Sequence, residues 1–252
     1  MRIVSLVPST TETLFDLGVG HYVVGRTAFC VYPAEAAAVP QVGGTKTPDL
    51  DRIAALRPDL VLTNAEENRA EDMARLVRLA PVASFAPRRV KHALADLVAL
   101  GGLVGRWAAG SAFAEEGRAA QAALQARARP FRFAYLIWRE PWMAVGADTF
   151  VGDVLAQAGG VNVYADATTR YPTLTPDDLF ARAPDLIFLP DEPFPFAARH
   201  ADSLAALSPD PAAWRPRLQL VDGSLLAWHG TRLLKGLRWL SGLPLAPNSA
   251  IF

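Results

Sequence analysis

The chain has 252 residues, 51% of them apolar, and its 25 basic residues balance its 25 acidic residues. This length suits one large domain or two small ones, and the apolar fraction is sufficient for a sizeable core. The zero net charge argues against a nucleic-acid-binding protein, which usually carries a basic face, and the single cysteine, Cys30, excludes an internal disulfide.

The first 105 residues alternate between short apolar runs and helical segments, which predicts a parallel sheet covered by helices. Strands are predicted at 2–7, 22–25, 60–64 and 81–86, and helices at 9–18, 47–57, 67–80 and 91–105. Ser9 or Thr10 is expected to cap the first helix. Thr47 is expected to cap the second helix, with Pro48 at its first position.

Residues 106–129 have a different composition, rich in alanine, with charges throughout and no proline. They predict a single helix of up to about 36 Å, at about 1.5 Å per residue. Gly110 and Gly117 are expected to weaken it by roughly 1 kcal/mol each.

The earlier pattern returns after residue 130. Strands are predicted at 132–138, 161–166, 186–190 and 218–223, and helices at 148–160, from Thr175 onward, at 203–209 and at 231–243. The stretch TPDDLFARAPDLIFL (175–189) is a near copy of TPDLDRIAALRPDLVL (47–62), and the elements before each copy correspond in order. The sequence therefore predicts two α/β lobes of similar topology, with domains at 1–105, 106–129 (the joining helix) and 130–252.

The carboxyl ends of parallel strands are where ligands bind, and a chain of two lobes is expected to hold its ligand between them. The loops that this rule selects are 8–10, 26–32, 64–68, 138–142, 190–196 and 223–230.

Several motifs recur together along nearly the whole chain: VSLVPSTTETLFDLGVG, CVYPAE, QVGGTKTPDLDRIAALRPDLVL, AEENRAED, GGVNVYAD and PTLTPDDLFARAPDLIFL. This set resembles the ABC-transporter substrate-binding proteins for metal chelates, the helical-backbone metal receptors, and most of all their vitamin B12-binding branch. The resemblance implies an α/β fold of the class III periplasmic-binding-protein type. In that fold two Rossmann-like lobes with parallel sheets are joined by a single long backbone helix.

The resemblance also implies site residues. Phe29 matches an aromatic residue of the family's cleft, and Tyr171 matches a tryptophan of the opposite lobe. Thr45, followed by Lys46, and Asn64 stand where the family places aromatic residues. Two further tryptophans lie in loops that line the cleft in the family, Trp142 and Trp228.

Aromatic walls with a few amide or guanidinium groups suit a flat, apolar macrocycle with polar edges. WREPW (138–142) offers Trp138, Arg139 and Trp142 for such a site, although tryptophans at the end of a strand are as often part of a core. His229 is either an axial ligand to a chelated metal or a histidine bonded to nearby backbone.

Two groups of acidic and polar residues remain open to two interpretations. Glu67 and Asn68 follow the strand at 60–64 and either contact the ligand edge or solvate the start of a helix. The resemblance implies that acids on both lobes dock with arginines of an ABC permease, although acids in the first turn of a helix are stabilising without any partner. The docking candidates are Glu71, Asp72, Asp177 and Asp178.

Motifs for other chemistries are missing from the sequence. The four histidines show no HxH or HExxH spacing, and no P-loop, GxGxxG or GxSxG motif occurs. We therefore expect no catalytic residues, no covalent cofactor and no protein-held bare metal.

These observations predict a non-catalytic protein that binds a metal chelate, cobalamin or a related corrinoid first, with haem or a ferric siderophore next. The alternative from another class is a tetrapyrrole metal chelatase, in which His229 acts with Glu140 or Glu67 as base and metal relay. A cytoplasmic corrinoid carrier or sensor is a third interpretation.

The beginning of the chain bears on its compartment. Residues 1–25 lack the unbroken apolar run of a secretory signal, and the central apolar stretch 94–105 is too short to span a bilayer. We expect a chain that does not span a membrane and is cytoplasmic as written, or extracytoplasmic (periplasmic) if an upstream signal was removed.

Overall fold

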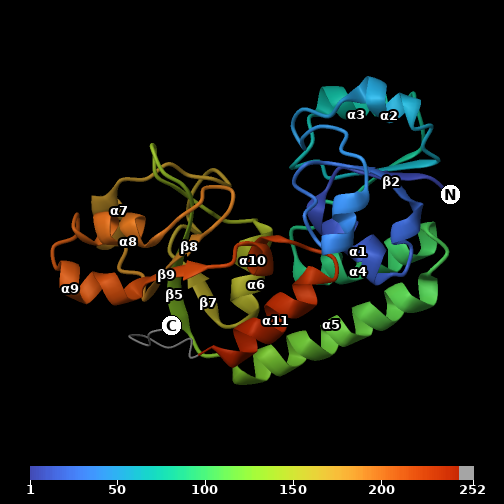
Figure 1. Ribbon diagram of the computed structural model, residues 1–252. Helices are drawn as coiled ribbons and strands as arrows, with labels where there is room; N and C mark the ends of the chain where they lie inside the picture. Colours follow the sequence, from blue (N-terminus) through green and yellow to red (C-terminus); the bar gives the residue numbers. More distant parts are fainter. Residues whose placement is uncertain (244–252) are drawn as a thin grey trace. The chain divides into compact units, whose positions relative to one another are not determined.

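The computed structural model describes residues 1–243, which divide into two compact units. Unit 1 comprises 1–87, 91–116 and 228–233, and unit 2 comprises 88–90, 117–227 and, among the described residues, 234–243. Figure 1 labels the helices and strands of both units.

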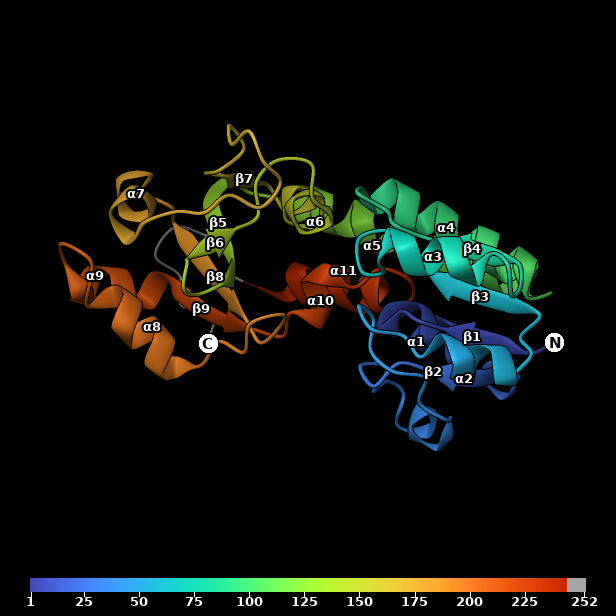
Figure 2. The same ribbon diagram turned by 90° about the horizontal axis from the view of Figure 1, so that it is seen from above.

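Unit 1 contains a parallel sheet of four strands in the order β2-β1-β3-β4, which Figure 2 shows. Its strands are β1 (Ile3–Ser5), β2 (Val23–Arg26), β3 (Leu60–Thr63) and β4 (Val82–Ser84). Its helical segments are α1 (Pro8–Asp16), η1 (Gly20–Tyr22), η2 (Ala34–Ala38), α2 (Leu50–Ala55), α3 (Ala70–Leu76) and α4 (Val90–Leu103).

The sheet of unit 1 has apolar side chains on both faces, as expected for a parallel sheet that is covered by helices on both sides. Ile3 belongs to a core cluster with Leu14 of α1 and Leu100 of α4. The next residue, Val4, belongs to a second cluster with Ile53 of α2 and residues of α3. This alternation follows from the two-residue period of a strand.

Unit 2 repeats this order with β7-β5-β8-β9, all parallel, and adds β6 antiparallel to β5. Its strands are β5 (Phe131–Trp138), β6 (Met143–Ala144), β7 (Gly160–Asn162), β8 (Leu186–Pro190) and β9 (Leu218–Val221). Its helical segments are α6 (Phe150–Gln157), α7 (Pro176–Ala181), α8 (Ala198–Ala205), α9 (Pro211–Trp214), η3 (Arg215–Arg217) and α10 (Ser224–Ala227). The prediction of two α/β lobes of similar topology is confirmed.

Two helices belong to both units. The long helix α5 (Trp107–Arg127) begins in unit 1 and ends in unit 2, as predicted for 106–129, and α11 (Arg232–Gly242) does the same. The predicted ranges place 130–252 in one lobe, whereas Trp228–Leu233 packs with unit 1.

The two copies of Thr-Pro-Asp begin their helices differently. Thr175 caps α7 as predicted, because its hydroxyl accepts a hydrogen bond from the Asp178 amide at 3.2 Å. The prediction that Thr47 caps α2 is wrong, since Asp49 accepts from the Arg52 amide at 2.9 Å instead. In this copy Pro48 forms an antiparallel bridge with Gly43, which keeps the segment extended and delays the helix.

Other element boundaries also differ from the predictions. Neither Ser9 nor Thr10 caps α1, which begins at Pro8 with Val7 at the N-cap. The helix predicted at 203–209 is α8, which begins five residues earlier, at Ala198. Six short elements were not predicted, namely β6, α9, α10 and the 3-10 segments η1, η2 and η3.

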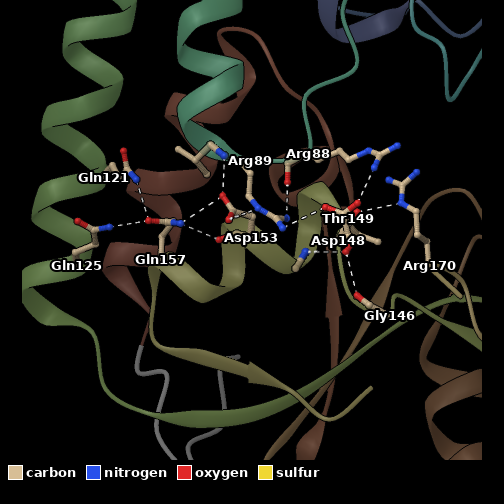
Figure 3. Close-up of polar contacts among 12 residues, drawn as sticks. Arg88, Arg89, Gln121, Gln125, Gly146, Asp148, Thr149, Asp153, Gln157 and Arg170 are labelled. Carbon is tan, nitrogen blue, oxygen red and sulfur yellow. Dashed lines mark hydrogen bonds and ion pairs between the residues drawn. The ribbon is translucent and has the colours of Figure 1, made fainter. Parts of the chain in front are cut away.

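Residues 88–90 are fixed within unit 2 by polar contacts around α6 (Figure 3). The Asp153 carboxylate accepts from the Val90 amide at 2.7 Å, and Asp148 pairs with Arg88 at 2.6 Å and with Arg89 at 3.1 Å. The amide oxygen of Gln157 accepts from two side chains of α5, Gln121 at 2.8 Å and Gln125 at 2.7 Å. These contacts hold the chain segment and the end of α5 against α6.

Glycines bring the backbones of α4 and α5 close together within unit 1. A Cβ at Gly110 would collide with the carbonyl oxygen of Leu97, and a Cβ at Gly101 would lie 2.8 Å from the Arg106 carbonyl oxygen. The glycine at 110 therefore has a packing role in addition to its cost in helix propensity.

Replacing Gly110 with alanine is expected to lower the free energy of unfolding by about 1–3 kcal/mol, because the overpacking outweighs a propensity gain of about 1 kcal/mol. Gly102→Ala is the matched control, since a Cβ there meets nothing within 4 Å. That change is expected to stabilise by about 0.5–1 kcal/mol. Urea unfolding of both variants measures the difference, and a Gly110→Ala protein as stable as the native chain would contradict it.

Candidate functional site

Helix α1 has a buried polar face. Its members follow the spacing i, i+3, i+4, i+7, which places them on one side of the helix: Ser9, Glu12, Thr13 and Asp16. The first three are almost fully buried, and buried polar groups require hydrogen-bond partners. In unit 1 these partners come from the segment 228–232, more than 200 residues away along the chain.

Three residues of this face bind His229 and Thr231. The hydroxyl of Ser9 lies 3.2 Å from His229 Nε2, and Thr13 Oγ1 accepts from the Thr231 amide at 3.1 Å. The Thr231 hydroxyl donates to Asp16 at 2.5 Å. The segment is therefore held against α1 at several consecutive positions.

The fourth residue of the face, Glu12, fixes an arginine beneath two aromatic rings. Glu12 Oε2 accepts from Arg232 Nε at 2.7 Å, and both side chains are buried. The Arg232 guanidinium carbon lies 4.2 Å from the Tyr32 ring centroid and 5.4 Å from that of Trp228. The two rings meet edge to face at 5.9 Å. We call Tyr32 and Trp228, with Arg232 beneath them, the aromatic shelf of unit 1.

An amide network holds the loop that follows β3. The Asn64 amide nitrogen lies 3.3 Å from His229 Nε2 and 3.5 Å from Glu67 Oε1. Asn68 accepts from the Asn64 backbone at 2.8 Å and donates to the Thr45 carbonyl at 2.8 Å. Asn64 and Asn68 are buried, so their amides position the loop from within.

Lys46 and Phe29 lie at the edge of this network. The Lys46 ammonium donates to the Glu66 carbonyl at 2.6 Å, which ties the turn at 43–47 to the loop after β3. The Phe29 side chain is 60% exposed and its ring lies beside Gly44. Unit 1 thus brings together seven of the residues selected from the sequence: Thr45, Lys46, Asn64, Glu67, Asn68, Trp228 and His229.

His229 is neutral at pH 7. Loss of solvation on burial lowers its pKa to about 4. The Asn64 amide oxygen accepts from the Glu66 backbone at 2.8 Å, which orients the amide nitrogen toward His229 as a donor. Nε2 is therefore the acceptor of the imidazole, and coordination of a metal through Nε2 would break this hydrogen bond.

Asp96 lies near His229, at a cavity of about 10 Å³ with room for roughly one water. The cavity is lined by Thr10, Thr13, Phe85, Asp96, Leu97, Leu100, His229 and Gly230. Burial raises the pKa of Asp96 to about 6, an effect that His92 partly offsets. Burial therefore shifts the pKa of each group in the direction that favours its neutral form.

These two groups have opposite effects on stability between about pH 4 and pH 6.5. The unfolded chain binds a proton at His229 that the folded chain does not, so His229 destabilises the fold as pH falls, by up to about 3 kcal/mol at pH 4. Asp96 keeps its proton longer in the folded state, so its contribution is lost as pH rises from about 4 to 6.

The Asp96→Asn variant is therefore expected to gain stability more steeply than the native chain as pH rises from 4.5 to 6.5. The His229→Asn variant is expected to show the reverse, a flattened or falling profile over the same range. Urea unfolding at several pH values measures both. Parallel profiles for the native and His229→Asn proteins would refute the role of His229.

Unit 2 has its own aromatic cluster beyond β5 and β8. Trp138 and Phe194 meet edge to face at 5.6 Å, Phe194 and Phe196 lie 4.7 Å apart, and Trp142 stacks on Phe196 at 6.1 Å. The sequence left open whether the two tryptophans of WREPW lie at a binding surface or in a core. Trp138 is 42% exposed, and Trp142 packs against the core.

Arg139 and Tyr171 lie beside this cluster. The Arg139 guanidinium lies 5.8 Å from the Trp142 ring and pairs with Glu140 at 3.4 Å. Tyr171 is 41% exposed, and its loop is bonded to the strand after Trp142, since the Leu174 amide donates to the Trp142 carbonyl at 2.9 Å.

Several residues of these sites were not selected from the sequence: Ser9, Glu12, Tyr32, Phe194, Phe196 and Arg232. The loops expected at strand ends contain four of them, Ser9, Tyr32, Phe194 and Phe196. The spacing of the polar residues on α1 could have been detected in the sequence. The segment 228–232, which supplies their partners, could not have been identified in this way.

The four candidate docking acids lie in the first turns of α3 and α7. Glu71 and Asp177 are exposed. Asp178 is engaged within unit 2, where it accepts from the Tyr164 hydroxyl at 2.9 Å and pairs with Arg182 at 3.2 Å. Burial and this acceptor raise the pKa of Tyr164.

Within residues 1–243, no three or more His, Cys, Asp and Glu side chains are grouped so as to hold a metal ion. Over the same residues, none of the helices combines the length and apolar character needed to cross a bilayer.

Two α/β units of the same strand order, each with exposed aromatic side chains beyond its strands, define a two-lobe binding protein. The model of the family described as periplasmic binding protein matches residues 3–211. The chain therefore belongs to the periplasmic binding protein family, and the fold and family predicted from its motifs are confirmed.

Individual relatives agree with this assignment. The chain is 26% identical over 191 residues to a vitamin B12-binding protein of Vibrio cholerae, covering 74% of this chain and 69% of the relative. The periplasmic heme-binding protein RhuT from Roseiflexus sp. RS-1 has a TM-score of 0.82 and 26% identity, covering 95% of this chain and 96% of that one. The periplasmic vitamin B12-binding protein BtuF of Vibrio cholerae shares the fold, with a TM-score of 0.79, 20% identity and coverage of 95% and 94%.

Proposed function

We propose that this protein captures a metal chelate for uptake by an ABC transporter, with cobalamin or a related corrinoid as the first candidate. The observation that carries the proposal is the aromatic shelf of unit 1, where Tyr32 is 43% exposed and Trp228 is half-buried beside it. Aromatic faces of this kind give large contact area to a flat apolar macrocycle. The relatives named for vitamin B12 and heme binding support this ligand class.

We assign the ligand contacts to exposed and half-buried side chains of each unit. In unit 1 these are Phe29, Tyr32, Trp228 and the ammonium of Lys46; in unit 2 they are Trp138, Arg139 and Tyr171. Asn64, Asn68 and His229 take a supporting role, because their polar atoms hold one another and the loops that carry the shelf.

Haem is the second candidate, and exposed tyrosines favour it. A tyrosine oxygen is an established protein ligand of haem iron, and both Tyr32 and Tyr171 are more than 40% exposed. A haem complex with such a ligand has a visible absorption spectrum that changes when the tyrosine is replaced by phenylalanine.

The remaining assignments follow from the same proposal. The protein acts without catalysis, holds its chelate non-covalently, and works outside the cytoplasm. Glu71 and Asp177 are exposed and are the docking acids for an ABC permease. A pull-down of the permease by the native protein, weakened in a Glu71→Gln/Asp177→Asn double variant, tests the partner.

Titration calorimetry of the native protein with cyanocobalamin, haemin and a ferric siderophore tests the function. We expect saturable one-to-one binding of cyanocobalamin or haemin in the nanomolar range, which corresponds to about −12 kcal/mol. Absence of binding by all three compounds would overturn the assignment.

A further inference from the structure

The charge beneath the aromatic shelf of unit 1 is cancelled from within the fold. Arg232 lies under both rings of the shelf, and its Nε donates to Glu12 at 2.7 Å. The exposed fractions of the two side chains are only 8% and 3%, so little solvent screens this pair. A ligand on the shelf therefore meets a neutral pair at the place where the arginine alone would present a positive charge.

The neighbouring loops do not replace the lost positive charge. The charged residues in the loops at 43–47 and after β3 are Lys46, Glu66, Glu67 and Arg69. Together with the Glu12–Arg232 pair they give three positive and three negative groups, so the charges balance. A negatively charged edge of a ligand therefore gains no affinity from these groups, and an uncharged amide edge loses none.

We propose that Glu12 is a specificity-determining residue, which selects chelates with an uncharged rim by neutralising Arg232 beneath the shelf. The inference rests on the proposed function and makes it more specific. It predicts that the protein prefers macrocycles with amide groups at their rim to macrocycles that carry carboxylates, such as haem. Glu12 acts through Arg232 and is a positioning residue. It also fixes the guanidinium plane against Tyr32 and Trp228, where it supports both rings.

The decisive experiment changes the charge of the ligand and leaves the protein untouched. Cyanocobalamin is compared with its monocarboxylic acids, in which one peripheral amide is hydrolysed to a carboxylate, each isomer tested separately by calorimetry at pH 7. We expect at least one isomer to bind about tenfold more weakly than cyanocobalamin. This difference in affinity, which we call the gap, should shrink as the salt concentration is raised. Affinities within twofold for all isomers would overturn the inference.

Variants then assign the effect to Glu12. Glu12→Gln is expected to narrow the gap between amide and acid forms to about threefold or less, and Glu12→Asp to preserve it. Asp51→Asn, which removes one exposed negative charge from α2, is the matched control and should leave the gap unchanged. A Glu12→Gln protein that binds cyanocobalamin with the native gap would refute the role of Glu12.

The result also separates this inference from the proposed function. Tight binding of haemin without binding of cyanocobalamin would keep the metal-chelate function and overturn the inference. Failure of every chelate to bind would overturn both. Because the ligand comparison uses the native chain, affinities within twofold overturn the inference even where Glu12→Gln does not fold, and Glu12→Asp then remains as the variant that tests the role of Glu12.

Discussion

Replacing Trp228 with alanine is expected to weaken chelate binding by about 30-fold or more, which corresponds to about 2 kcal/mol. Trp228 supplies one of the two rings of the shelf and contacts both the second ring and the arginine below. Its removal takes away aromatic contact area and opens the shelf to water. Calorimetry with cyanocobalamin or haemin measures the loss.

The control for this variant is Trp107→Ala. Trp107 is a tryptophan of the same unit, 64% exposed at the start of α5 and outside the shelf, so its loss should change affinity by less than about threefold. Circular dichroism should show both variants folded. An unchanged affinity in Trp228→Ala would mean that the ligand binds elsewhere.

Replacing Arg232 with alanine is expected to lower the free energy of unfolding by about 3–5 kcal/mol, because it leaves the Glu12 carboxylate buried and unpaired with its arginine. The double variant Glu12→Leu/Arg232→Met removes both charges and keeps the volume. It is expected to recover most of the loss, since a buried pair and an apolar replacement are often of similar stability.

Arg215→Ala provides the comparison for an exposed pair. Arg215 lies 2.5 Å from Asp202, but the two side chains are 42% and 63% exposed, and such pairs contribute about 1 kcal/mol or less. Urea unfolding of the three proteins distinguishes the cases. A loss at Arg232 no larger than that at Arg215 would contradict the importance of the buried pair.

Most strands of the two parallel sheets were predictable because they contain the apolar runs that a buried parallel sheet requires. LVLT of β3 and LIFLP of β8 are fully buried, as their composition indicates. The likeness of the two sheets was predictable from the repeated unit, whereas the order of the strands within each sheet was not predicted. Helix α5 was predictable from its alanine content and its length.

Features that depend on distant partners were not predictable. The polar residues of α1 were interpreted as helix-capping residues or as evidence against a secretory signal, because their partners lie more than 200 residues away in sequence. The start of α2 was missed for a local reason, since Pro48 pairs with Gly43, five residues before it, and the helix begins only after this bridge. A local pattern indicates which residues need a partner, but it does not identify the partner.

The polar face of α1 also has a consequence for how the polypeptide is completed during synthesis. Residues 1–116 supply most of unit 1, yet Ser9, Glu12 and Thr13 each have a hydrogen-bond partner in the segment 228–232. At ordinary elongation rates the ribosome needs on the order of ten seconds between these two points. During this time the polar side chains of α1 lack the partners that the segment 228–232 supplies. A fragment ending at residue 116 should therefore be cleaved by protease far faster than the same segment in the full chain.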